Sequence, residues 1–247
     1  MIASSSVYQF LVERVIHETP VLSSLQFEIH RTQPITLYSH EIGPNPWKVA
    51  IILSALELEY KTIFVSFEEV KQYPFVDINP NGRLPAIIDP NQGVTLWESG
   101  AIIQYLIDTY DLSHKLSYDN IPDKYHTQQW LHFQMSGQGP YYGQLGWFKR
   151  QDEKQSIAIK RYSDEVRRVT GVLNKVLEGC QWLVGDKCTY TDLSFVPGQE
   201  ILSLLSTDLV TELASEFPNV KAWMTRMKKR ADVRKVLEEK RQAMEQL

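Results

Sequence analysis

Residues 79–106, NPNGRLPAIIDPNQGVTLWESGAIIQYL, constrain the fold of this 247-residue chain more than any other stretch. Two short apolar runs, 83–89 and 94–97, flank the turn sequence PNQG, which favours an antiparallel hairpin. Pro85 cannot donate a hydrogen bond to a strand ladder, so it should start the first strand or lie at an edge or bend. Apolar residues then recur at helical spacing from position 102 onward. The stretch therefore predicts a hairpin that runs directly into a helix.

The start of that helix carries a carboxylate and a hydroxyl, Glu98 and Ser99. The first backbone N–H groups of a helix have no partner inside it, and this end favours negative charge. One interpretation makes Ser99 an N-cap and Glu98 an acid that complements the helix dipole. The other makes the helix start a binding site for a small carboxylate. The two residues alone leave both interpretations open.

The arrangement RLPAI, turn, WESGAIIQYL resembles the glutathione-binding half of the glutathione transferases. In that family the proline is cis, and the backbone of the residue before it pairs with the cysteinyl unit of glutathione. The Glu-Ser pair binds the γ-glutamyl end. By position, the resemblance implies these roles for Leu84, Pro85, Glu98 and Ser99. It favours the second interpretation of the helix start.

The residues before this stretch have the element order of a thioredoxin-like domain. Residues 35–38 alternate as a strand does, 47–56 suit a buried helix, and 60–67 are typical of a second strand. Strand, helix, strand, hairpin and helix in this order resemble the thioredoxin-like half of the transferases. We therefore expect an α/β glutathione-binding domain over residues 35–111. Residues 1–34 precede it as an N-terminal extension that we expect to be mobile in part.

Transferases of this fold place a Tyr, Ser or Cys beside the sulfur, at the end of the first strand or in the loop after it. Residues 39–48, SHEIGPNPWK, contain no Cys, which disfavours a mixed-disulfide mechanism. Asn45, just before a helix that we expect to begin at Pro46, is the candidate for this position. A thiol pKa of about 8.5 must fall by roughly 1.5 units, about 2 kcal/mol, for half ionisation at pH 7. One hydrogen bond to an ionised group contributes roughly 1.5–3 kcal/mol, and a helix N-terminus contributes roughly 0.3–2 kcal/mol. Asn45 and its helix can therefore stabilise a thiolate. The alternative is that Asn45 only caps the helix.

The second half of the chain predicts a separate all-helical domain. Residues 112–122 are polar and lack apolar periodicity, so we expect the linker there. Helical patterns follow throughout 123–247, beginning with a helix over 123–135 that should break at the glycines and proline of 137–140. The sequence TYTD at 189–192 has the spacing of a capping box with Asp in place of Glu or Gln, at the start of a later helix.

Two further groups complete the candidate site. Residues of the broken helix could line a pocket for an electrophile beside the sulfur, namely Gln134, Ser136, Tyr141, Tyr142, Gln144 and Trp147. Interdomain packing explains this cluster equally well. Lys71 falls where the family supplies a partner for the glycyl carboxylate of glutathione, with Gln72 as the alternative.

Six longer sequence segments point to one branch of this family. The similar segments are SHEIGPNPWKVAIILSALELEY, NPNGRLPAIIDP, LWESGAII, QMSGQGPYYGQ, RYSDEVRRVTGVLNKVLE and WLVGDKCTYTDLSFVP. They resemble the fungal branch of the cytosolic glutathione transferases that is related to the yeast nitrogen-catabolite regulator and prion protein. In that branch an Asn faces the sulfur, and Asn45 matches it. Residues 1–34 hold three Gln and no Asn, so they depart from the Gln/Asn-rich prion segment.

The resemblance implies a cytoplasmic enzyme that binds glutathione as co-substrate, without a metal, and activates its thiolate for attack on a small electrophile. Peroxidase activity, detoxification and secondary metabolism fall within this expectation. A glutathione-dependent isomerase or a tailoring enzyme of a biosynthetic pathway is one alternative, and a non-enzymatic regulator with a glutathione site is another. The family also implies a homodimer, with the helix after Glu98 near the interface.

Composition argues against other classes of function. The formal net charge of −4 argues against a general nucleic-acid binder, and no apolar run approaches transmembrane length. The two cysteines, Cys180 and Cys188, give neither a disulfide framework nor a metal-ligand spacing, and they fit a reducing compartment. Cys188 lies beside the capping box, where we expect it to pack and not to react.

Overall fold

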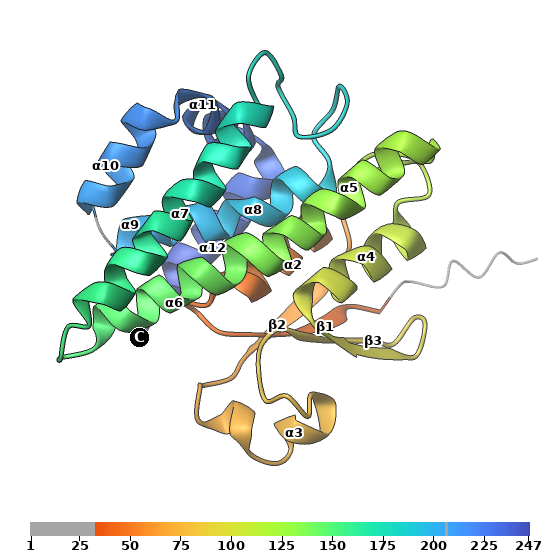
Figure 1. Ribbon diagram of the computed structural model, residues 1–247. Helices are drawn as coiled ribbons and strands as arrows, with labels where there is room; N and C mark the ends of the chain where they lie inside the picture. The colour runs from red at the N-terminus through yellow and green to blue at the C-terminus, as the bar shows by residue number, and fades with distance from the viewer. Residues whose placement is uncertain (1–32, 206) are drawn as a thin grey trace, which may run out of the picture. The chain divides into compact units, whose positions relative to one another are not determined.

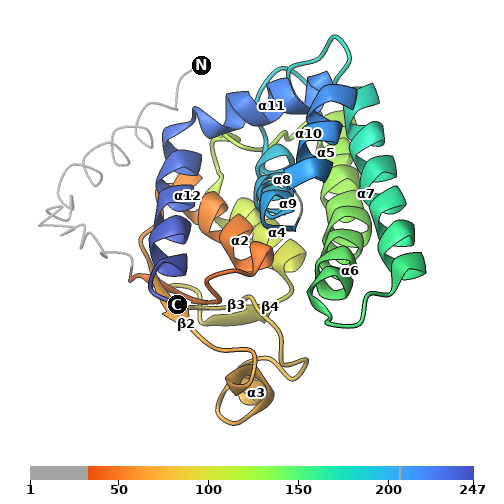
Figure 2. The same ribbon diagram turned by 90° about the vertical axis from the view of Figure 1, so that its left-hand side faces the viewer.

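The computed structural model describes residues 33–205 and 207–247, and residues 33–247 form one compact unit (Figures 1 and 2). Nearly all of the predicted N-terminal extension, residues 1–32, lies outside the described residues. Gln33 is joined to the hairpin turn, since its N–H donates to Asn91 Oδ1 at 2.8 Å and its carbonyl accepts from Asn91 Nδ2 at 2.9 Å.

A mixed four-stranded sheet with strand order β2-β1-β3-β4 forms the base of the first half. The strands are β1 Ile35–Ser39, β2 Tyr60–Phe64, β3 Ala86–Asp89 and β4 Val94–Trp97. β1 and β2 are parallel, while β1 with β3 and β3 with β4 are antiparallel, so the predicted hairpin is confirmed. The second strand was predicted to reach residue 67 but ends at Phe64. The chain turns away there, because Ser66 and Glu69 cap each other in front of a short 3-10 turn.

Two long helices cover one face of this sheet and a short one lies beyond the other (Figures 1 and 2). The helical segments are α2 Pro44–Ala55, η1 Glu69–Lys71, α3 Phe75–Ile78 and α4 Ser99–Tyr110. α2 begins at Pro44, two residues earlier than predicted, because a proline at the first helical position loses no helical hydrogen bond. Ile35 and Leu37 alternate into the main core with α2 and α4, whereas Tyr38 packs with Phe75 on the α3 side.

The second half is helical, as predicted. It comprises α5 Ile121–Phe133, η2 Gln134–Gln138, α6 Gly139–Arg150, α7 Ser156–Val176, α8 Tyr190–Glu200, α9 Leu202–Leu205, α10 Thr207–Glu216, α11 Pro218–Lys228 and α12 Ala231–Met244. The predicted break at 137–140 is wrong, because α5 and α6 continue into each other through one π-helical turn, η2 (Figure 1). Proline lacks an N–H group, and a local π turn is a known way for a helix to absorb such a gap. α2 packs against α4, α8 and α12, which joins the two halves in one core.

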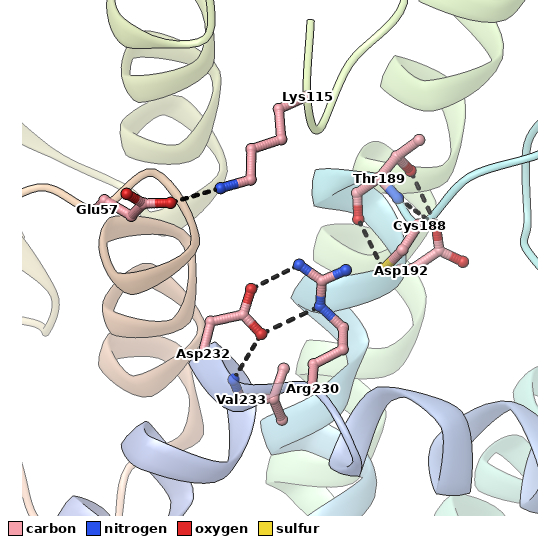
Figure 3. A network of polar contacts seen from close by, with 8 residues as sticks. All are labelled: Glu57, Lys115, Cys188, Thr189, Asp192, Arg230, Asp232 and Val233. Carbon is pink, nitrogen blue, oxygen red and sulfur yellow. Dashed lines mark hydrogen bonds and ion pairs between the residues drawn. The ribbon is translucent and has the colours of Figure 1, made fainter.

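The predicted capping box at the start of α8 is confirmed (Figure 3). Asp192 Oδ2 accepts from the backbone N–H of Thr189 at 2.8 Å and from its hydroxyl at 2.9 Å. Asp192 Oδ1 accepts from the Leu183 N–H at 3.0 Å and from the Trp223 indole at 2.9 Å. Cys188 beside it is buried, and burial raises the pKa of its thiol, so this cysteine has the packing environment that we expected.

Candidate functional site

The register of the sheet brings separate segments of the predicted site to one end. Ala86, the first residue of β3, pairs with Tyr38 near the end of β1 and with Trp97 at the end of β4. The Leu84–Pro85 bond therefore lies beside the start of α4 and beside the loop that joins β1 to α2. This peptide bond is cis, as the family resemblance implied.

The start of α4 has an unusual backbone. The helix begins at Ser99, and Glu98 stands in front of it with φ 69° and ψ 110°. A residue with a Cβ rarely adopts this backbone conformation, and the residues that do adopt it cluster at functional sites. Glu98 is exposed, whereas Ser99 is only 2% exposed. The backbone therefore turns the Glu98 side chain outward beside a buried helix start.

Ser99 is not an N-cap, so this part of the first interpretation is wrong. It is the first residue inside the helix, and no side-chain capping hydrogen bond forms at this end. The Ser99 hydroxyl has the thioether of Met135 as its hydrogen-bond partner among the described residues, with Oγ and Sδ 3.6 Å apart. The hydroxyl and the first N–H groups of α4 thus share one helix start that the side chain of the N-cap residue, Glu98, does not cap.

Asn45 is the second residue of α2 and does not cap it either. Gly43 occupies the N-cap position, and no side chain makes a capping hydrogen bond there. The Asn45 side chain is half-buried and lines a cavity of about 50 Å³ between α2 and the second half of the chain. This cavity is lined by Pro44, Asn45, Lys48, Gln134, Gln138, Gly139, Tyr142, Gly143, Ser194, Gly198 and Ile201.

Lys48, a residue that sequence reasoning missed, lies in this cavity wall one helical turn after Asn45. Its side chain is only 1% exposed, and its Nζ donates to Gln134 Oε1 at 2.6 Å and lies 3.1 Å from Met135 Sδ. Burial lowers the pKa of Lys48 from 10.5 to about 7, and the charge of Glu98 opposes this shift. A lysine within the apolar run WKVAIIL is the signal in the sequence that could have drawn attention to it.

A series of hydrogen bonds between buried side-chain amides holds Gln134, the partner of Lys48, in place. Gln134 Nε2 donates to Gln138 Oε1 at 2.9 Å, and Gln138 Nε2 donates to the carbonyl of Phe195 at 3.2 Å. α8 approaches this chain closely at Gly198, where an added Cβ would lie 2.3 Å from Gln138 Oε1. The amides fix the orientation of Gln134, so its oxygen faces Lys48. Gln138 and Gly198 were not predicted, because nothing local in the sequence marks either of them.

The structure brings two of the six predicted electrophile-pocket residues to the cavity, Gln134 and Tyr142. Tyr142 is buried, its hydroxyl lies 2.9 Å from Thr170 Oγ1 and accepts from Gln199 at 3.2 Å, and burial raises its pKa to about 12. The other four residues lie away from the cavity wall. Ser136 and Gln144 are exposed, Trp147 is 51% exposed, and Tyr141 packs against Tyr162.

Lys71 is exposed and closes a turn next to Leu84. Its Nζ donates to the carbonyl of Gly82 at 2.6 Å. Gly82 has φ 58°, and a Cβ at that position would lie 2.7 Å from the carbonyl oxygen of Val70, so only glycine fits. A second, longer contact joins Lys71 Nζ to the carbonyl of Asn81 at 3.5 Å, so the ammonium group is held beside the turn that precedes Leu84.

Other kinds of site find no support in the part of the chain that the structure describes. Within residues 33–205 and 207–247, no group of three or more His, Cys, Asp or Glu side chains is arranged to hold a metal ion. In the same residues, no helix is both long enough and apolar enough to cross a membrane.

The chain is similar to known proteins over both halves. Residues 33–108 match the glutathione S-transferase N-terminal domain, and residues 141–231 match the C-terminal domain. The glutathione S-transferase-like protein tpcF of Aspergillus fumigatus is 46% identical over 215 residues, which is 82% of this chain and 94% of that protein. The glutathione transferase URE2P6 of Phanerochaete chrysosporium, solved with oxidized glutathione, is 44% identical with a TM-score of 0.81, covering 87% of this chain and 99% of the other. Ure2p, solved with glutathione, is 37% identical with a TM-score of 0.77 over 85% of this chain and 97% of the other.

Proposed function

Because the chain belongs to the glutathione S-transferase family, in the fungal branch related to Ure2p, we propose that it binds glutathione and uses the ionised thiol to attack a small electrophile. The observation that carries this proposal is the convergence at one end of the sheet. A cis Leu84–Pro85 bond, a strained Glu98 and a helix start that the Glu98 side chain does not cap meet there.

The glutathione backbone is proposed to bind along this end of the sheet. The extended backbone of Leu84 would pair with the cysteinyl unit, and Lys71 would bind the glycyl carboxylate. Ser99 and the N–H groups of α4 would receive the γ-glutamyl carboxylate, because a helix N-terminus favours an anion. Glu98, whose exposed side chain is turned outward by its backbone, would accept from the α-ammonium group.

The sulfur is proposed to lie at the start of α2, beside Asn45. A thiolate there would accept from the Asn45 side-chain amide and would face the positive end of the α2 dipole. Asparagine exchanges no proton, so Asn45 would stabilise the thiolate without acting as a base. Gln134 and Tyr142 would form the wall of the adjoining electrophile pocket.

Assembly and location are part of the same proposal. We expect a homodimer, as is usual in this family, with α4 near the interface. We also expect a cytoplasmic protein, which agrees with the free state of Cys180 and Cys188. Light scattering at micromolar concentration tests the dimer, and a monomer there would contradict it.

Calorimetry with glutathione tests the site. Ser99→Ala should weaken glutathione binding by about 1.5–3 kcal/mol, because one hydrogen bond to a charged group is lost. Stability should hardly change, because the hydrogen bond that the Ser99 hydroxyl makes within the described residues is a weak one, to the thioether of Met135. Ser203→Ala is the matched control, since it also removes a hydroxyl with one contact, to the Glu200 carbonyl, but in an exposed position far along the chain. Equal affinities in Ser99→Ala and the control would refute the assigned role.

A turnover screen separates the reaction classes. Haloarenes, hydroperoxides and glutathionyl adducts are offered, and both product formation and glutathione consumption are followed. Conjugation consumes one glutathione for each product, whereas an isomerase returns it. Glutathione binding without turnover of any of the three classes would contradict the proposed enzyme activity and favour the regulatory alternative.

A further inference from the structure

Lys48 and Asn45 share one face of the first turn of α2. Residues three apart on a helix lie on the same face, and both side chains line the same cavity. Asn45 is half-exposed and Lys48 is buried behind it. A group that enters the cavity beside Asn45 therefore meets a wall that includes Lys48.

The partners of the Lys48 amine are neutral. One N–H donates to the amide oxygen of Gln134 and another faces the sulfur of Met135. Within the described residues, Lys48 makes no ion pair, although the more distant charge of Glu98 acts on it. A lysine in such a place favours the uncharged amine, whose lone pair is available to accept a proton.

The other groups that face Lys48 leave it as the one base of the cavity in the described residues. Tyr142 from α6 is the second titratable residue in the wall, and burial keeps its phenol protonated at neutral pH by raising its pKa to about 12. Glu98, at the start of α4, acts on Lys48 from outside the wall. η2 contributes Gln134 and Gln138 to the wall and α8 contributes Ser194, and none of these side chains is titratable near neutral pH. β1 and α12 also pack on α2 but contribute no residue to the wall.

We infer that the uncharged amine of Lys48 accepts the proton of the glutathione thiol. This inference rests on the proposed function, which brings the sulfur to Asn45. The S–H bond breaks, a third N–H bond forms on Nζ, and the products are a thiolate at Asn45 and an ammonium group at Lys48. When the sulfur forms its bond to the electrophile, the leaving group departs with its electron pair. The ammonium group gives its proton to a basic leaving group such as an alkoxide, or to solvent water or buffer when the leaving group is a halide. The amine is then ready for the next thiol.

The acid strengths of the two groups allow this transfer. A free thiol has a pKa of about 8.5, and Lys48 has a pKa of about 7 because it is buried. The transfer is thus uphill by roughly 1.5 pKa units before the charges interact. An opposite charge nearby shifts a pKa by roughly 1–3 units, and the thiolate and ammonium favour each other in this way. The amide of Asn45 adds its hydrogen bond to the thiolate side. Together these effects exceed the difference.

The test follows where the proton goes when glutathione binds. At pH 8 most Lys48 is an uncharged amine and most free glutathione is a thiol. Calorimetry in buffers of different ionisation enthalpy counts the protons released, and ultraviolet absorbance counts the thiolate formed. Wild-type protein should form bound thiolate with far fewer than one proton released for each thiolate. In Lys48→Met each thiolate that forms should release about one proton, and kcat/KM should fall by roughly a hundredfold, the usual contribution of a general base.

Lys240→Met is the matched control. Lys240 is also buried and its pKa is also lowered by burial, but it lies on α12 beside Glu200 and does not line the cavity. It should keep the wild-type proton ratio. One proton released for each thiolate in wild-type protein would overturn the inference while leaving glutathione binding intact. Absence of glutathione binding to wild-type protein would instead overturn the proposed function, and this inference with it.

Discussion

Glu98→Gly should make the protein more stable and a weaker binder of glutathione. Glu98 has φ 69° and ψ 110°, a conformation that glycine adopts freely and that a residue with a Cβ does not. Its side chain is exposed and makes no capping hydrogen bond to α4. Replacing it therefore relieves the backbone and leaves the core unchanged.

The expected gain follows from two opposing terms. A residue held in such a region costs roughly 1–3 kcal/mol. Glycine loses more backbone entropy on folding, which costs roughly 0.5–1 kcal/mol. The difference is a stabilisation of roughly 0–2.5 kcal/mol, and each kcal/mol raises Tm by about 2–4 °C in a protein of this size. Losing the carboxylate that we propose to accept from the α-ammonium group should weaken glutathione binding by about 1.5–3 kcal/mol, roughly tenfold to a hundredfold.

Glu57→Gly is the matched control. Glu57 also has a positive φ, 58°, and lies exposed just after the end of α2. Its side chain forms an ion pair with Lys115 (Figure 3). Its replacement should also raise Tm, since exposed ion pairs contribute little, but should leave glutathione affinity unchanged.

Differential scanning calorimetry and glutathione titration on both variants measure the two effects. A Glu98→Gly protein with a lower Tm would show that the backbone at this position is not strained. A stabilised Glu98→Gly protein with wild-type affinity would show that the carboxylate does not bind glutathione. Either result refutes one half of the reasoning and leaves the other half standing.

Two further predictions concern the buried contacts between the two halves. Lys48 has a pKa of about 7 in the folded state and an ordinary value of 10.5. Between these two pH values Lys48 binds a proton in the unfolded state but not in the folded state. Its contribution therefore makes the free energy of unfolding rise with pH in this window, by up to roughly 1.4 kcal/mol for each pH unit. Urea unfolding at pH 7 and pH 8.5 should therefore show wild type gaining about 1.5 kcal/mol of unfolding free energy relative to Lys48→Met, since about half of the folded protein still carries the proton at pH 7. A difference between the two proteins that does not change with pH would contradict the lowered pKa. Gly198→Ala should destabilise by roughly 1–3 kcal/mol, because its Cβ would lie 2.3 Å from Gln138 Oε1. Gly143→Ala, in the open α6 position where a Cβ meets nothing within 4 Å, should be neutral or stabilising in the same denaturant measurement, and equal effects of the two substitutions would argue against the close approach of α8.

Local chemistry in the sequence determined much of the fold. Turn residues between two apolar runs predicted β3 and β4, apolar spacing predicted α4, and the TYTD sequence predicted the capping box of α8. Each of these depends on residues a few positions apart, whose interactions a sequence displays directly. The cis bond at Pro85 and the candidate ligand residues came from the family resemblance, and the structure places Leu84, Glu98 and Ser99 at one end of the sheet.

The tertiary structure alone decided what lies behind Asn45. The sequence shows an apolar helix containing Lys48, but the amide oxygen that accepts a hydrogen bond from its side-chain nitrogen comes from a residue 86 positions away. The continuation of α5 into α6 through η2 places Gln134 and Gln138 there, and the glycine at 198 lets α8 close over them. A pKa depends on how completely the surrounding chain removes water and which dipoles replace it. The sequence by itself determined that a lysine is present, and burial between the two halves determined its charge.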